Sequence, residues 1–166
     1  MSLISKKKSD VVSDGAGVRG FFRVQLNEDG RVVGDSGWRE NQVTNLGIQD
    51  YLVTWLVTGS GGKAVTHMAI GTGGVPASND TTLSGQVTDG KRAAVSTSIV
   101  SSRTAQFTAA FNSSDSFLTA SANISNIGLF ATSATNLGTL FAGNTFASSA
   151  VATNQSINAT YQIRIS

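Results

Sequence analysis

Residues 156–165 alternate between polar and apolar side chains without a break. Successive side chains of a β-strand point to opposite faces of its sheet, so this two-residue period predicts a strand with one buried and one exposed face. The residues predicted to face inward are Ile157, Ala159, Tyr161, Ile163 and Ile165, and those predicted to face outward are Asn158, Thr160, Gln162 and Arg164. The fold has to supply neighbouring strands and a hydrophobic layer to cover the inner face.

The same period recurs upstream and predicts two hairpins. Apolar or small side chains alternate over 93–99 and over 105–111, and the short polar connection between them indicates an antiparallel pair. The alternating segment 20–26 is followed by the turn sequence Asn-Glu-Asp-Gly at 27–30 and then by the short apolar segment 31–33. This order of signals predicts a second hairpin near the start of the folded part.

Composition extends the strand prediction to the whole fold class. Only 13% of the residues are charged, and Gly, Ser, Thr, Ala and Asn are abundant, which is typical of many short strands joined by tight turns. Further strand signals lie at 65–72, 124–130 and 139–142, and no internal repeat is found. We therefore expect an all-β protein, a jelly-roll-like β-sandwich of about eight strands with one short inserted helix.

The inserted helix is predicted after residue 44. Ile48, Leu52, Trp55 and Leu56 recur at helical spacing, Thr44 or Asn45 is placed to cap the start, and Gly59 is placed to end it. We expect about three turns, with this apolar face packed on the sheets.

Residue types that are rare or missing exclude most catalytic and metal chemistry. The chain has no Cys and a single histidine, His67, inside an apolar strand signal, which favours a structural role for that side chain. The carboxylates are scattered and mostly beside turn residues, and no Gly-x-Ser-x-Gly or Walker sequence is present. We expect no enzymatic activity, no cofactor and no metal.

Charge and hydropathy argue against nucleic acid and membrane as partners. The formal net charge is +2, and part of the positive charge lies in Lys6, Lys7 and Lys8, so the remainder is close to neutral. No apolar run approaches the ~20 residues of a membrane-spanning helix. The lysines follow only two apolar residues, the reverse of a secretory signal, so we expect synthesis in the cytoplasm.

Residues 1–18 are predicted to form a flexible N-terminal arm ahead of a β-sandwich domain at 19–166. The arm mixes lysines, serines and small residues without a helical or alternating period. It is either a solvated tail or a docking arm that becomes ordered on an acidic, grooved partner surface. On the second interpretation Lys6, Lys7 and Lys8 are candidate partner-binding residues.

Trp38 is a further candidate for partner binding. It lies in a Gly-rich turn away from any alternating segment, so it either covers the end of the sandwich or is exposed as an interface anchor. An exposed tryptophan on a β-sandwich also suits a carbohydrate-binding module, although such sites usually gather two or more aromatic side chains.

Three motifs resemble those of the small β-sandwich structural proteins of tailed bacteriophages. They are the helix entry GWRENQVTNLG at 37–47, the strand end HMAIGTG at 67–73 and the strand ISNIGLF at 124–130, followed by an alternating last strand. The likeness covers roughly residues 20–166. Many relatives carry an acidic residue where this chain has Asn126, which leaves a charge contact there in doubt.

The resemblance implies a virion structural protein without catalytic residues. The leading expectation is a capsid cement or decoration protein, a homotrimer that sits between capsomers on the major capsid protein and stabilises the assembled shell. A tail or baseplate subunit is the alternative within the same group, and a host-attachment carbohydrate-binding module is the alternative from another class. The expected location is the capsid surface, after assembly in the bacterial host cytoplasm.

Overall fold

The computed structural model describes residues 17–87, 92–135 and 137–166, and within these ranges the fold is all-β and sandwich-like, as predicted. The strands are β1 (Val18–Glu28), β2 (Arg31–Asp35), β3 (Arg39–Val43), β4 (His67–Gly71), β5 (Ala93–Ala94), β6 (Ser96–Ser101), β7 (Thr104–Phe111), β8 (Ala122–Phe130), β9 (Ala142–Val151) and β10 (Ser156–Ile165). One helical segment follows β3, as α1 (Asn45–Gly47), the π-helix η1 (Ile48–Val53) and α2 (Thr54–Thr58). A 3-10 turn, η2 (Ser113–Asp115), follows β7.

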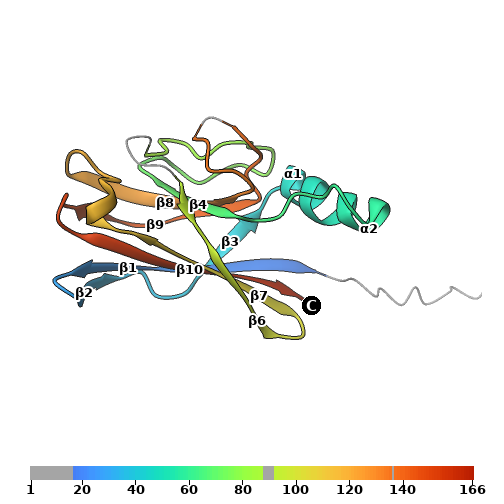
Figure 1. Ribbon diagram of the computed structural model, residues 1–166, viewed down its shortest axis with the longest axis horizontal. Coiled ribbons are helices and arrows are strands. Elements are labelled where there is room, and N and C mark those ends of the chain that lie inside the picture. Colours follow the sequence, from blue (N-terminus) through green and yellow to red (C-terminus); the bar gives the residue numbers. More distant parts are fainter. Residues whose placement is uncertain (1–16, 88–91, 136) are drawn as a thin grey trace, which may run out of the picture.

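The strands form one antiparallel sheet that folds into two layers, in the order β5-β4-β8-β9-β3-β1-β10-β7-β6 with β2 paired to β1. Strand β3 joins the layers, since Asn41 pairs with Gly20 of β1 and Gln42 pairs with Gly143 of β9. On the other side only Val95 separates β5 from β6, so the chain passes there from one layer to the other. The sandwich is therefore nearly closed, and Figure 1 shows the two layers crossing.

The core lies between these layers and is centred on β1 and β10. Phe22 and Tyr161 are fully buried and directly opposite in register, with stacked rings whose centroids lie 5.6 Å apart. The Tyr161 hydroxyl accepts a hydrogen bond from the Asn41 amide, which ties the joining strand to the core. The predicted inner face of β10 is confirmed from Ile157 to Ile163, but Ile165 is 48% exposed because the second layer ends before it.

The predicted hairpin at 20–33 is present, and the one at 93–111 is present over β6 and β7 but not over Ala93 and Ala94, which pair with β4 in the other layer. β1 and β2 meet at a turn in which Asp29 and Gly30 have positive φ values, 49° and 76°, so the glycine suits the left-handed conformation. β6 and β7 pair antiparallel, with Ile99 opposite Ala105.

The predicted strand at 139–142 is wrong in its limits. Residues 139–141 are not in a strand, and β9 begins at Ala142 and continues to Val151. Most of that strand consists of Gly, Ala, Ser, Asn and Thr, whose small side chains give no apolar alternation. The strand number rises from about eight to ten because β3 was not predicted and because the predicted strand at 93–99 is divided into β5 and β6.

Asn126 of β8 holds the long connection that follows β4 by hydrogen bonds to its backbone. Its side chain is fully buried, and its amide nitrogen donates to the carbonyl oxygens of Gly74 at 3.2 Å and Ser84 at 2.8 Å. A carboxylate at this position accepts hydrogen bonds but donates none when ionised, so an acidic residue could not make the same two contacts.

The helical segment begins and ends where predicted, but it exposes a different face. The Thr44 hydroxyl accepts from the Gly47 amide at 2.8 Å, and Gly59 ends α2 in a left-handed conformation with φ 63°. The expected packing face containing Trp55 and Leu56 is wrong, because these two side chains are 57% and 81% exposed. The hydrogen bonds of a π-helix join residues i and i+5, so η1 rotates the side chains that follow it relative to a regular α-helix. Within η1, Tyr51 is the buried residue.

Most of the predicted N-terminal arm, residues 1–16, lies outside the described residues. Val18 already belongs to β1 and pairs with Ile165, and Gly17 exchanges two backbone hydrogen bonds with Ser166. Strand β1 therefore begins at Val18, two residues before the strand predicted from residue 20.

Gly47 provides a test of how the helical segment is seated. A Cβ atom added there would overlap the backbone carbonyl of Phe141, whereas one added at Gly74 would meet nothing within 4 Å. We expect Gly47→Ala to destabilise the fold by about 1–3 kcal/mol, which thermal unfolding measures as a drop of roughly 2–4 °C per kcal/mol. Gly74→Ala is the matched control. Equal melting temperatures for the two variants would contradict the packing described.

Candidate protein interaction surface

The last turns of the helical segment carry a cluster of exposed apolar side chains, which we call the helix tip. Its members are Val53, Trp55, Leu56 and Val57, with exposed fractions of 45%, 57%, 81% and 79%. Figure 1 shows α2 projecting beyond the sheets. No charged residue occurs between Asp50 and Lys63. Contiguous exposed apolar residues of this kind mark protein interaction sites in soluble proteins.

The base of this segment is fixed to the sandwich by Tyr51. Its ring lies 4.9 Å from that of Phe141, and its hydroxyl donates to the Thr139 carbonyl oxygen at 2.6 Å. Burial raises the pKa of Tyr51 to about 12, so it is a neutral donor at physiological pH. The helix tip is consequently held in place rather than loosely tethered.

A second anchor links the helix to the loop that follows it. The Lys63 ammonium donates to the Asp50 carboxylate and also to the Thr139 hydroxyl, which in turn donates to Asp50. The hydrogen bond from Lys63 lowers the pKa of the Asp50 carboxyl, and the bond from Thr139 adds to this effect. Both ends of the exposed apolar stretch are thus joined to one polar cluster.

Beside the helix lies an apolar groove at the open end of the sandwich, which we call the end groove. Ile99, Ala105 and Ile163 form one row across β6, β7 and β10, on the face that is buried elsewhere along the sheet. The groove has a volume of about 330 Å³. Its principal apolar lining residues are Leu52, Val65, Ile99, Phe107, Ile163 and Ile165.

Strand β6 forms one border of this groove and also an edge of the sheet. Among the described residues it pairs only with β7, and all of its residues are exposed, including Ile99 at 85% and Val100 at 55%. An edge strand with free backbone groups and apolar side chains can pair with another chain. The exposed edge of β6 is therefore a second surface suited to protein contact, besides the helix tip.

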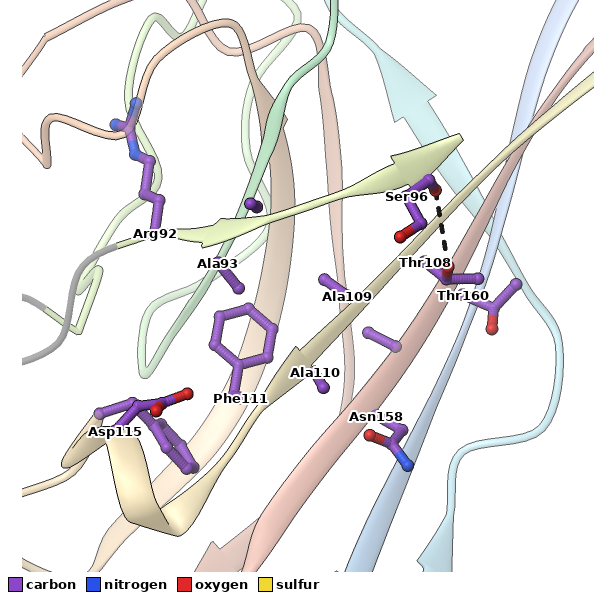
Figure 2. A pocket seen from close by; sticks show the side chains of 13 residues that line it. Arg92, Ala93, Ser96, Thr108, Ala109, Ala110, Phe111, Asp115, Asn158 and Thr160 are labelled. Carbon is purple, nitrogen blue, oxygen red and sulfur yellow. Dashed lines mark hydrogen bonds between the residues drawn. The ribbon is translucent and has the colours of Figure 1, made fainter. Parts of the chain in front are cut away.

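A larger groove of about 1010 Å³ runs along β7 and beside the segment that crosses between layers (Figure 2). Thr108, Asn158 and Thr160 line it with hydroxyl and amide groups, and Asp115 lies at one end. Arg92 points away from the other labelled side chains in Figure 2.

Arg92 is engaged with the protein itself. Its guanidinium donates to the carbonyl oxygens of Leu137 at 2.8 Å and Thr135 at 3.1 Å and lies 3.4 Å above the Phe130 ring centre. Burial lowers its pKa to about 10, which still leaves it protonated at neutral pH. This cation secures loops rather than offering a charge to a ligand in the groove.

The residues singled out from the sequence do not meet in one place in the described structure. Trp38 is 46% exposed after Gly37, and it does not line the end groove. Lys6, Lys7 and Lys8 lie outside the described residues. His67 is half-buried, with Nδ1 2.8 Å from the Thr66 hydroxyl, and burial lowers its pKa. No group of three or more potential metal-ligating side chains occurs in the described ranges.

Sequence reasoning missed the helix tip. It placed Trp55 and Leu56 against the sheets, although Val53 and Val57 extend the apolar residues well beyond that one face. Such a pattern gives no single apolar face, so it was the available signal that the face containing Trp55 and Leu56 need not be the buried one.

Comparisons with known proteins identify no relative: no protein-family model, curated protein or solved structure matches this chain. Within the described residues, none of the helices has both the length and the apolar character needed to cross a membrane.

Two aromatic residues of the helical segment test the division into anchor and tip. Tyr51 is 5% exposed and Trp55 is 57% exposed. We expect Tyr51→Ala to destabilise the fold by about 3–5 kcal/mol, as for other buried aromatic truncations, and Trp55→Ala to change stability by less than about 0.5 kcal/mol. Chemical denaturation of both variants measures this, and a large loss for Trp55→Ala would show that the tip belongs to the core.

Proposed function

We propose that this chain is a structural protein of a tailed-bacteriophage particle, a capsid cement protein that binds between capsomers and stabilises the assembled shell. The observation that carries the proposal is the helix tip, a fixed and exposed apolar surface on a sandwich-like body. Its partners are the major capsid protein and other copies of the chain, in a trimer. The motifs at 37–47, 67–73 and 124–130 support the assignment to the virion.

Burial of the helix tip supplies the binding energy. Covering one large apolar side chain contributes roughly 1.5–3 kcal/mol, so several of them in one contact give a stable attachment. Trp55 is the natural anchor, because large aromatic residues dominate the energetics of many interfaces. A protein that binds only the assembled lattice lowers the free energy of that lattice by linkage and so opposes its disassembly.

Low charge fits attachment by apolar contact rather than by electrostatic attraction. The stretch from Tyr51 to Gly62 has no charged side chain, and the formal net charge of the chain is +2. A contact of this kind should be insensitive to salt, in contrast to any contribution from Lys6, Lys7 and Lys8.

Electron microscopy of purified particles tests the proposal. We expect density for the sandwich on the shell, with α2 directed toward the capsid surface between capsomers. Density on the tail alone would favour the alternative, a tail or baseplate subunit that uses the same apolar contact. Absence of the protein from the particle would overturn both.

Charged substitutions in the helix tip should uncouple attachment from folding. Leu56→Asp with Val57→Asp places two carboxylates where both side chains are largely exposed, so we expect an unchanged melting temperature and at least tenfold weaker binding to particles that lack the protein. Co-sedimentation measures the binding. The matched control is Val32→Asp with Val33→Asp in β2, at 53% and 54% exposure, which should bind normally. Equal loss in both double variants would remove the helix tip from the interface.

The N-terminal arm should add a salt-dependent contribution to attachment. Deleting residues 1–12 leaves every described strand intact, and we expect several-fold weaker co-sedimentation at low salt. This difference should shrink as salt rises, because exposed charges are screened beyond about 8 Å at physiological ionic strength. Equal binding of the full and shortened chains at low salt would reduce the arm to a solvated tail.

A further inference from the structure

The end groove is an apolar site inside the fold that the body of the protein does not fill. Its floor continues the inner face of β10, β7 and β6, and Leu52 and Val65 line it from the helical segment and the loop after it. Ile99 and Ile165 on the floor are 85% and 48% exposed. Leaving such residues uncovered costs free energy, so an occupant with apolar side chains is favoured there.

The first described residues place the start of the chain at the rim of this groove. Gly17 donates to the Ser166 carbonyl oxygen at 3.0 Å and accepts from the Ser166 amide at 2.9 Å. Val18 lies directly opposite Ile165, which lines the groove. Gly17, the first described residue, therefore lies next to an apolar surface that lacks a cover within the described residues.

The sequence just before Gly17 is suited to a chain that folds back into the groove. Asp14-Gly15 is a turn dipeptide, and it is preceded by the adjacent apolar residues Val11 and Val12. Residues 13–16 span up to about 13 Å when extended, so the valines can reach the groove from Gly17. In an extended segment neighbouring side chains point in opposite directions, which matches a groove with an apolar wall on each side.

Charge complements this placement. Lys63 and Arg103 line the groove; Lys63 is already paired with Asp50, whereas Arg103 forms no ion pair among the described residues and is the available cation. The two valines are flanked by Asp10 and Asp14, so an acidic residue lies on each side of the apolar pair. The lysines at 6–8 would then stand beyond the groove, directed outward.

We propose that the end groove binds residues 9–13 of the same chain, with Val11 and Val12 between its two walls. The N-terminal segment thereby covers the apolar end of the sandwich and holds Lys6, Lys7 and Lys8 at a defined place beside it. This contact forms in the isolated protein and does not depend on the proposed function.

Disulfide trapping in the full chain tests this contact, because the natural sequence contains no cysteine. Ser13→Cys is combined with Ser101→Cys, a groove-lining position in β6, in a glutathione redox buffer. We expect an intramolecular disulfide. The effective concentration of the two thiols should be at least tenfold higher than in the same protein carrying Val11→Asp and Val12→Asp. The two aspartates keep the tether but remove the apolar contact.

A remote pair controls for chance collision. Val32 lies opposite Asn27, at the other end of β1 and about 30 Å from Gly17 along the strand, so Ser13→Cys with Val32→Cys should form no intramolecular disulfide. If the two aspartates leave the disulfide yield unchanged, the cysteines meet only because the chain tethers them, and the proposal is overturned. Disulfides formed only between chains would overturn it as well, since they would assign the segment to a neighbouring copy.

Discussion

The pairing of β1 with β10 is the interaction on which the rest of the structure depends. It joins the first and last strands of the chain in an unbroken antiparallel register from Val18 opposite Ile165 to Asn27 opposite Ser156. It also places Phe22 against Tyr161 at the centre of the core and leaves β3 and β7 to extend the sheet on either side. The paired residues are far apart in sequence, so closing the loop between them costs chain entropy that the packing of the core has to offset.

The same pairing determines where the contact surfaces lie. β1 and β10 continue past the end of the second layer, so the inner face of the sheet emerges there as the floor of the end groove. The helical segment is seated over that end by Tyr51, and η1 turns the residues after it outward. A hydrophobic sequence that reads as a core helix is thereby converted into an exposed helix tip.

The parts of this fold that sequence could predict are those with a local signal. The two hairpins and β10 have clear two-residue periods, and Thr44 and Gly59 have the chemistry of helix ends. β9 lacked such a signal because its residues are mostly small and show no apolar alternation, and one of its two partners, β3, is remote in sequence. The direction of Trp55 depended on a π-helix, and the end groove depended on how far one layer extends past the other, neither of which is a local property.

The central claim is that the helix tip is buried against another subunit in the assembled particle. Hydroxyl-radical labelling with mass spectrometry measures it directly, because the oxidation rate of Trp55 reports the solvent exposure of that side chain, which is 57% in the isolated chain. We predict that the Trp55 rate falls at least fivefold on attachment to particles, while the rates at Val32 and Val33 of β2 stay within twofold. An unchanged rate at Trp55 in attached protein would contradict the account.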